Sequence, residues 1–177
     1  MGKNRGFTLI ELMVTIAIMA IIASMAAPSF RSLISEQKIN SSARELVMAI
    51  NQAKSQAALM KTTVGLCLSK TQTDNDFTKD ECATATIPEY TATNPGPPVV
   101  PVLTTAQKEE VLKSRIISVQ LDAGVRVEST SATSVLFSDI GSISPSTPQT
   151  FNFCKSGKQK TITVTRLGII SQASGTC

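Results

Sequence analysis

The chain opens with MGKNRGFTLIELMVTIAIMAIIASMAAPSF (residues 1–30), which contains its longest apolar run. The run extends from Phe7 to Ala27, follows two basic residues, and holds a single acid, Glu11. A helix of this length, at about 1.5 Å per residue, reaches about 30 Å, the thickness of a bilayer core. The sequence therefore predicts a membrane-spanning helix whose basic N-terminal side stays in the cytoplasm.

Glu11 argues against an ordinary signal peptide. A signal peptide has small residues at its cut site, and residues 23–27 (ASMAA) offer such a site, so this alternative and a plain signal anchor stay open. A carboxylate inside a membrane helix is costly and by default marks a functional residue. If the chain were cut after Gly6, the charged amine of Phe7 would lie about one helical turn from Glu11. The two charges would then neutralise each other in lipid, within one chain or between neighbours.

The stretch from Gly6 to Glu11 (GFTLIE), followed by an apolar helix, resembles the N-terminus of type IV prepilins and type II secretion pseudopilins. The resemblance implies that residues 1–6 are a leader, cut off between Gly6 and Phe7 by a prepilin peptidase that also methylates the amine of Phe7. It implies that Glu11 pairs with the N-terminus of a neighbouring subunit during filament assembly. Residues 7–28 then form the transmembrane and filament-core helix.

An amphipathic helix is predicted to continue this span over residues 29–61. Apolar residues recur there at spacings near 3.6, as on a helix with one apolar face. The two helical segments would be continuous and bent at Pro28, where pilins often carry a helix-kinking proline. Packing on the protein's own domain is the favoured interpretation of the stripe between Leu46 and Met60, and a partner-binding face is the alternative.

Residues 62–177 are predicted to form a β-rich globular domain. Short alternating runs between turn signals begin with a strand at residues 62–69 and repeat from Ile116 onward. Such spacing indicates an antiparallel sheet or sandwich, and the amphipathic helix covers one face, which gives an α+β fold. Residues 70–101 read as a long polar loop, functional or disordered, with a proline-rich stretch at residues 94–101.

The formal net charge of +4 lies on the helical part of the chain. The leader carries Lys3 and Arg5, and residues 29–61 carry five basic side chains against two acidic ones. Residues 62–177 carry ten of each and balance to zero. A nucleic-acid-binding domain needs a basic folded face, so the charge distribution argues against a general nucleic-acid function.

The chain has four cysteines and no histidine. Disulfides persist in oxidising compartments such as the periplasm, where the part beyond the membrane helix would lie. Of the three possible pairings, the local one joins Cys67 to Cys82 and Cys154 to Cys177, and each closure would stabilise the fold by about 3 kcal/mol. Free buried cysteines stay open as the alternative. A zinc site is not expected, because the sequence has no Cys-x-x-Cys spacing and no histidine.

No enzymatic chemistry is expected from this sequence. Without histidine there is no Ser-His-Asp triad and no Cys-His pair, and the glycines are too scattered for a phosphate-binding loop. Asp74 and Asp76 lack the spacing of a calcium-binding EF-hand loop. The sequence therefore predicts no catalytic residue, no metal and no cofactor, and a periplasmic enzyme on a membrane anchor is kept only as an alternative.

The C-terminal half extends the resemblance. Four short stretches, in this order, resemble the minor pilins FimU and FimT and the pseudopilin GspH: residues 46–58 (LVMAINQAKSQAA), 64–67 (VGLC), Phe137 to Gly141 with a later Phe151, and residues 162–168 (ITVTRLG). With the N-terminus, the resemblance covers most of the chain except roughly residues 70–115. It implies a pilin fold, with the long N-terminal helix packed on the C-terminal antiparallel domain.

Binding to DNA is the alternative from a different class of function. Minor pilins of the FimT kind that take up DNA carry a Gly-Arg-x-Arg motif near the C-terminus, and this chain has Gly-Ile-Ile-Ser (residues 168–171) there instead. Lys155, Lys158, Lys160 and Arg166 remain as a small basic cluster for weak, salt-sensitive contact with DNA phosphates. A solvated strand end explains the same residues without a ligand.

The resemblance as a whole implies a FimU-like minor type IV pilin. Such a subunit belongs to the pilus tip or the assembly-initiation complex and supports pilus biogenesis and twitching motility, with DNA uptake as a further role. A type II secretion minor pseudopilin and a DNA-binding minor pilin for natural transformation are the alternatives. The implied partners are other major and minor pilins, prepilin peptidase, the inner-membrane pilus assembly platform and, before assembly, membrane lipid; DNA is less favoured. The implied location is the inner membrane, crossed once with the C-terminal domain in the periplasm, and then the filament at the cell surface.

Overall fold

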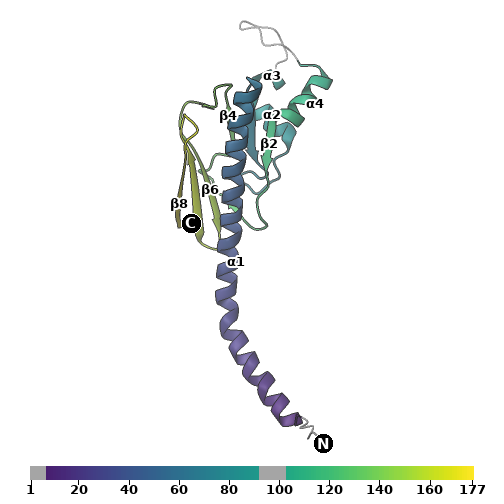
Figure 1. Ribbon diagram of the computed structural model, residues 1–177, viewed down its shortest axis with the longest axis vertical. Coiled ribbons are helices and arrows are strands. Elements are labelled where there is room, and N and C mark those ends of the chain that lie inside the picture. Colours follow the sequence, from purple (N-terminus) through teal and green to yellow (C-terminus); the bar gives the residue numbers. More distant parts are fainter. Residues whose placement is uncertain (1–6, 92–102) are drawn as a thin grey trace, which may run out of the picture.

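A long helix runs the length of the molecule and carries a globular part on its second half (Figure 1). The computed structural model describes residues 7–91 and 103–177. The predicted leader and the proline-rich stretch at residues 94–101 lie outside the described residues. The helix, α1, spans Leu9–Met60 and leaves the globular part as a bare stalk.

Helix α1 has a defined beginning and end. Thr8 is its N-cap, and Glu11 completes a capping box, which satisfies backbone donors that the first turn leaves free. The helix ends where Lys61 adopts a left-handed conformation with φ of 52° and donates its N–H to the carbonyl of Ala57. The two predicted helical segments are therefore one continuous element.

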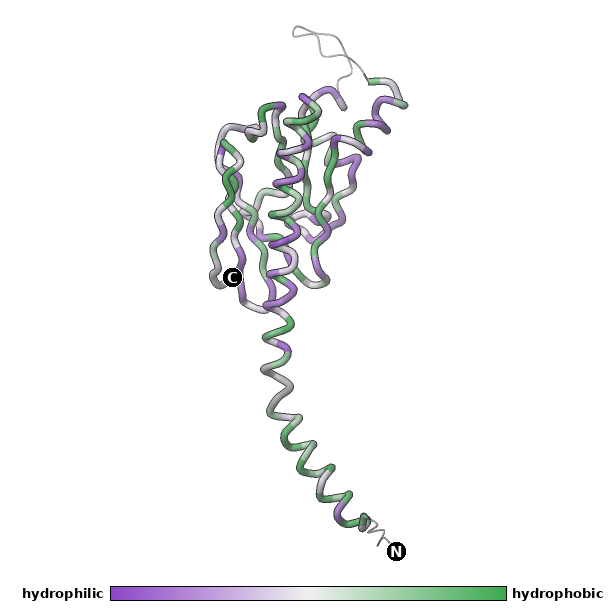
Figure 2. The backbone as a smooth tube through the Cα atoms, in the orientation of Figure 1, coloured by the Kyte–Doolittle hydropathy of each residue, from purple (hydrophilic) through white to green (hydrophobic). Residues whose placement is uncertain are grey.

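The stalk is apolar over its N-terminal half, as Figure 2 shows. No straight helix among the described residues is by itself long and apolar enough to cross a membrane. The segments Leu9–Met25 and Phe30–Met60, inclined at 45° to each other, meet the requirement together by length and composition. Pro28 lies between them, and its part in the bend stays a prediction.

The first sheet contains the only parallel strand pair among the described strands. Its order is β2 (Ile116–Val119), β1 (Val64–Leu68), β4 (Ser134–Phe137), β5 (Ile143–Ser144). Strand β1 pairs with β2 in parallel and with β4 in antiparallel orientation. The sequence predicted antiparallel pairing throughout, and this one pair differs because a long crossover connects β1 to β2.

The crossover contains three helices, two of them within residues 70–101, where the sequence predicts a loop. It holds α2 (Lys79–Thr86), α3 (Pro88–Thr91) and α4 (Thr105–Ser114). Helices α2 and α4 each begin with a capping box, formed by Thr78 with Glu81 and by Thr104 with Gln107. The prediction of a structureless polar loop is therefore wrong over α2 and α3, where local capping and a buried apolar face favour helix.

The second sheet is wholly antiparallel in the order β3 (Arg126–Val127), β6 (Gln149–Lys155), β7 (Lys158–Val164), β8 (Ile170–Thr176). Ser156 and Gly157 form the two-residue turn between β6 and β7, with φ of 52° and 78°. Positive φ at both positions matches the hairpin turn whose twist suits the flanking strands. The α+β fold expected from the sequence is confirmed.

The main core lies between α1 and the two sheets. From Ile39 to Ala57, α1 presents one buried apolar stripe to it, and the largest fully buried side chains opposite are Phe137, Phe151 and Phe153. Two side-chain hydrogen bonds also hold this helix, because Lys54 donates to the carbonyl of Leu167 in the β7–β8 turn and Gln56 to that of Ser114 at the end of α4. The favoured interpretation of the stripe, packing on the protein's own domain, agrees with this core.

Leu46 and Met48 offer a test of this packing on one helix. Leu46 is fully buried, whereas Met48 is 65% exposed. Leu46→Ala should lower the free energy of unfolding by about 2–5 kcal/mol, since it removes buried methyl groups and leaves a cavity. Met48→Ala should change it by less than about 0.5 kcal/mol. Chemical unfolding of the full chain in mild detergent measures both, and equal losses would contradict the assigned core.

Candidate functional site

The first turn of α1 gathers the polar groups of the predicted filament-assembly site. Oε2 of Glu11 accepts hydrogen bonds from the backbone N–H of Thr8 at 3.1 Å and from its hydroxyl at 2.9 Å. The N–H of Glu11 in turn donates to the Thr8 hydroxyl at 3.3 Å. Glu11 is thereby held one turn from Phe7, the predicted methylated residue, while Gly6 lies outside the described residues.

The half-helix that follows is exposed along its described length. Every residue from Phe7 to Met25 is exposed, so no other part of the described chain covers this rod. Its large exposed apolar side chains are Phe7, Leu9, Ile10, Leu12, Met13, Val14, Ile16, Ile18, Met19, Ile21, Ile22 and Met25. A continuous apolar surface of this size indicates a contact with membrane or with other proteins.

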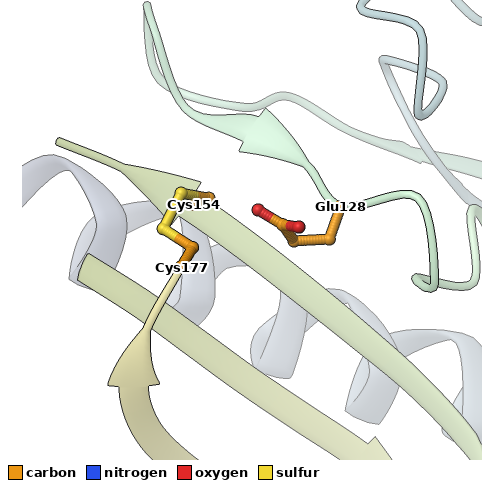
Figure 3. Close-up of side chains that lie close together, drawn as sticks. All are labelled: Glu128, Cys154 and Cys177. Atoms are coloured by element: carbon orange, nitrogen blue, oxygen red, sulfur yellow. A yellow bond between two sulfur atoms is a disulfide. The ribbon is translucent and has the colours of Figure 1, made fainter. Parts of the chain in front are cut away.

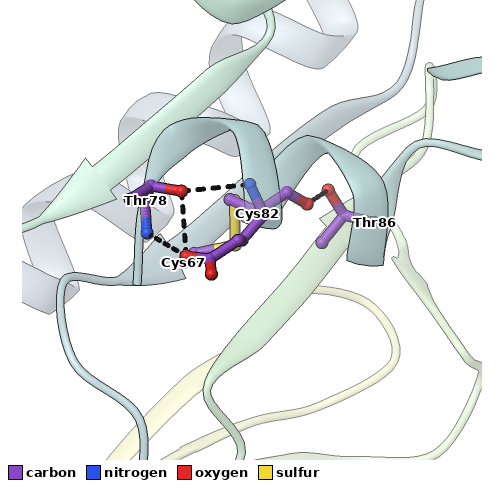
Figure 4. The surroundings of a disulfide bond; sticks show 5 residues. Cys67, Thr78, Cys82 and Thr86 are labelled. Carbon is purple, nitrogen blue, oxygen red and sulfur yellow. Dashed lines mark hydrogen bonds between the residues drawn. A yellow bond between two sulfur atoms is a disulfide. The ribbon is translucent and has the colours of Figure 1, made fainter. Parts of the chain in front are cut away.

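One disulfide ties the crossover to the first sheet (Figure 4). It joins Cys67 of β1 to Cys82 of α2, and both residues are fully buried. The hydroxyl of Thr86 donates to the carbonyl of Cys82 at 2.7 Å, and Thr78 caps the start of the same helix. Together these contacts hold α2 against β1, where it covers a second, smaller apolar cluster.

The other disulfide joins Cys154 at the end of β6 to Cys177 beyond β8. The structure thus has the pairing that the sequence favoured, and the free-cysteine alternative is overturned for all four residues. Glu128 lies beside the second bond, with its carboxylate and the two sulfurs within 4.8 Å of one another (Figure 3). Such a trio would suit a metal only as thiolates, and the disulfide removes that form of sulfur.

The structure separates the four residues of the predicted basic cluster. Lys155, Lys158 and Lys160 lie at or beside the β6–β7 turn, next to the point where α1 leaves the domain. Arg166 lies beyond the far end of β7, and that strand is about 20 Å long at about 3.3 Å per residue. Three lysines come together, and the arginine does not join them.

Each of the three lysines already has a partner. Nζ of Lys155 donates to the carbonyl of Ala123 at 2.6 Å, and that of Lys160 donates to the Ser174 hydroxyl at 3.1 Å. Lys158 forms an ion pair with Glu36 of α1 at 2.6 Å. The hydrogen bond from Lys158, with the charge of its ammonium, holds the pKa of Glu36 below its ordinary value of 4.5.

An apolar patch lies at the end of the domain remote from the stalk, and sequence reasoning missed it. Ile140, Leu167 and Ile169 are 76%, 66% and 62% exposed and surround a hollow of about 610 Å³. Nζ of Lys54 holds the carbonyl of Leu167 at 2.9 Å, so α1 positions the turn between β7 and β8. A signal was present in the sequence, because Leu167, Ile169 and Ile170 are apolar residues that flank the turn glycine Gly168.

Comparison with known protein families agrees with this architecture. Residues 1–27 match the prokaryotic N-terminal methylation motif. Residues 42–168, which include most of the buried half of α1 and nearly all of the globular part, match the family described as type II transport protein GspH. The chain belongs to the GspH family. The resemblance inferred from its sequence is confirmed at this level.

Membership of the GspH family makes the chain a minor pilin or pseudopilin. Members of this family are structural subunits rather than enzymes. The N-terminal motif implies processing by prepilin peptidase, membrane anchoring through the apolar helix, and assembly with other pilins or pseudopilins. Comparison with curated proteins and with solved structures gave no match.

The crossover disulfide should contribute measurably to stability. Replacing both Cys67 and Cys82 by alanine reopens a loop with a sequence separation of 15, which should lower the free energy of unfolding by about 3 kcal/mol. Chemical unfolding of the oxidised full chain in detergent measures the loss. With both proteins fully reduced, the difference should shrink to the small packing loss of two sulfur atoms. An oxidised variant as stable as wild type would contradict this role.

The ion pair between Lys158 and Glu36 makes a prediction for pH. Lys158→Gln removes the main cause of the shift, so the pKa of Glu36 should rise toward 4.5, whereas Lys155→Gln should leave it unchanged. Since the folded-state pKa is depressed, the stability that this pair adds is present above pH 4.5 and is lost as pH falls through the folded-state value. Carboxyl NMR of the full chain follows the titration, and an unshifted Glu36 in wild type would refute the assignment.

Proposed function

We propose that this GspH-family chain is a FimU-like minor type IV pilin, a structural subunit of the pilus tip or the assembly-initiation complex that supports pilus biogenesis and twitching motility. It would cross the inner membrane once, with its C-terminal domain in the periplasm, until it enters the filament. The exposed apolar half-helix, with Glu11 at its first turn and a packed domain at its other end, carries this proposal. One surface serves both environments, because lipid tails and neighbouring helices are both apolar.

Glu11 has the capacity to bind a neighbour while it caps its own helix. Both of its hydrogen bonds from Thr8 reach the same oxygen, Oε2. Oε1 accepts no hydrogen bond from the part of the chain that the structure describes. An ionised carboxylate has about four acceptor positions, so Oε1 is available to the methylated amine of Phe7 from an adjacent subunit. That contact would set the axial register between subunits.

The domain surface supports an assembly subunit over a DNA receptor. The patch of Ile140, Leu167 and Ile169 is apolar and exposed, as a contact with another pilin requires. At the matching turn a DNA receptor needs free cations, whereas Lys54 there holds the carbonyl of Leu167 and Arg166 lies far from the three lysines. DNA uptake is therefore not part of the proposal.

A minor pseudopilin of type II secretion is the second candidate. The description of the matched family favours it, since that description names type II transport. The physics of the stalk is the same in both systems, and only the partner subunits differ. Deleting the gene in its own host separates the two, because loss of surface pili and twitching supports the pilus and loss of secreted enzymes supports the pseudopilus.

Intact mass of the chain recovered from membranes of its host tests the proposal first. We expect loss of residues 1–6, one added methyl group on Phe7, and four hydrogen atoms fewer than in the fully reduced chain, as two disulfides require. Glu11→Gln should leave processing intact and lower recovery in sheared filaments by at least about tenfold, equivalent to about 1.4 kcal/mol. Removal of the charge abolishes the proposed pairing without shortening the apolar helix.

Thr15→Val is the matched control for the Glu11 variant. Thr15 lies one turn further along the same exposed half-helix and bonds only to the carbonyl of Leu12 within the described chain. Recovery of this variant in filaments should equal that of wild type. A recovered chain that begins at Met1 or near Ala27 would overturn the filament proposal altogether. Equal recovery of Glu11→Gln and wild type in filaments would show that Glu11 has no role in assembly.

A further inference from the structure

A hollow lined by hydroxyls and cations lies where α1 enters the domain. It measures about 240 Å³, and its lining is Arg31, Ser32, Ser35, Ser156 and Lys158. The hydroxyls of Ser35 and Ser156 share a hydrogen bond at 3.1 Å, which ties α1 to the β6–β7 turn. The hollow is therefore built from two elements far apart in sequence, α1 and the β6–β7 turn. The part of α1 that leaves the domain as the stalk lies at this end of the ribbon (Figure 1).

A second hollow adjoins the first and shares Ser156 with it. It measures about 350 Å³, and Arg126 and Lys155 lie in its lining. Neither lining contains an acidic residue, and each hollow presents two cations, Arg31 and Lys158 in the first and Arg126 and Lys155 in the second. Arginine and lysine beside serine hydroxyls form the donor set that phosphate groups prefer, because every one of these groups donates hydrogen bonds and the cations add charge.

The height of the hollow above the apolar run matches a particular layer of the membrane. The run ends at Ala27, and at about 1.5 Å per residue Arg31 lies about 6 Å beyond it and Ser35 about 12 Å. The headgroup layer is about 5–8 Å thick on each side of the hydrocarbon core. Arg31 thus starts inside that layer, and the hollow opens just above it, within reach of long basic side chains.

We propose that this hollow binds the phosphate of an anionic phospholipid in the periplasmic leaflet of the inner membrane. The inference rests on the proposed membrane-anchored state and adds a specific lipid contact to it. Arg31 and Lys158 pair with the phosphate, and Ser32 donates to its oxygens together with whichever of Ser35 and Ser156 accepts the hydrogen bond between them. Lys155 and Arg126 attract the surrounding anionic surface. The bound lipid holds the domain upright on the membrane until the subunit moves into a filament.

Glu36 opposes binding and so sharpens the test. Its carboxylate lies 2.6 Å from Nζ of Lys158, just outside the lining. A lysine ammonium has three donors, so Lys158 holds Glu36 and still offers a proton to a phosphate. The negative charge of Glu36 nevertheless repels that phosphate. Removing it should strengthen lipid binding, whereas removing the cations should weaken it.

Native mass spectrometry of the full chain in mild detergent tests the proposal, with equimolar phosphatidylglycerol and phosphatidylcholine as probes. Wild type should retain the anionic lipid in preference to the zwitterionic one. The double variant Arg31→Gln, Lys158→Gln should lower this preference by about 10- to 30-fold, as loss of two cations beside an anionic surface implies. Glu36→Gln should raise it several-fold.

Lys61→Gln with Lys113→Gln is the matched control. It removes the same charge from two exposed lysines at the end of α1 and on α4, away from the hollow. This variant should retain the wild-type preference. If the control lost as much lipid preference, net charge alone would explain the effect. If the double variant Arg31→Gln, Lys158→Gln kept the wild-type preference, the hollow would not be the lipid site. Either result overturns the proposal. Arg31, Lys61 and Lys113 are exposed and Lys158 is half-buried, and circular dichroism checks that both double variants fold.

Two further outcomes separate this inference from neighbouring ones. Inorganic phosphate at the lipid concentration should leave the bound lipid in place, and displacement would assign the hollow to free phosphate and overturn the lipid assignment. A chain that is cut after Gly6, methylated and anchored, yet shows no lipid preference, would refute this inference while the proposed function stands. A chain that is never processed would refute the proposed function whatever lipid it retains.

Discussion

Burial of one apolar stripe on α1 is the interaction on which the rest of the structure depends. From Ile39 to Ala57 this helix supplies one side of the main core, and both sheets pack against it. The two sheets share no strand, and both contribute side chains to the one core that this helix covers. The same helix continues into its exposed half, which begins at Leu9. One element therefore links the domain to the predicted membrane anchor.

The features that the sequence predicts well are those encoded by local pattern. The apolar run from Phe7, the helical periodicity up to Met60 and the alternating strands each have a period that identifies the element without knowledge of its neighbours. The helices of the crossover are harder to predict because the composition of this segment is polar. The residue patterns of their capping boxes, at Thr78 and Thr104, are nevertheless present in the sequence. The parallel pairing of β1 with β2 cannot be predicted from local pattern, because the relative orientation of two strands depends on the path of the segment that connects them.

The surface could be predicted only in part, for a physical reason. Residues 155–160 surround one tight hairpin turn, so their proximity follows from the sequence. Arg166 lies beyond the other end of β7, and the length of that strand separates it from the three lysines. The hollow beside that turn brings Arg31 close to Lys158, and the ion pair brings Lys158 close to Glu36, although Lys158 is far from both in sequence. Such contacts arise from tertiary packing, and no spacing in the sequence reveals them.

The two ends of the domain differ in chemistry, and this difference suits a subunit with a direction. The end that faces the stalk gathers cations and hydroxyls around Arg31 and Lys158, and the remote end exposes Leu167 and Ile169. A basic face is attracted to anionic headgroups, and an exposed apolar patch marks a site of contact with another protein. A subunit with such ends is stable in the membrane before assembly and has an exposed face that favours addition of a partner. Lipid and neighbouring helices cover the apolar helix equally well, so the helix does not distinguish the two environments. The two different ends of the domain therefore give the subunit a direction along the filament axis.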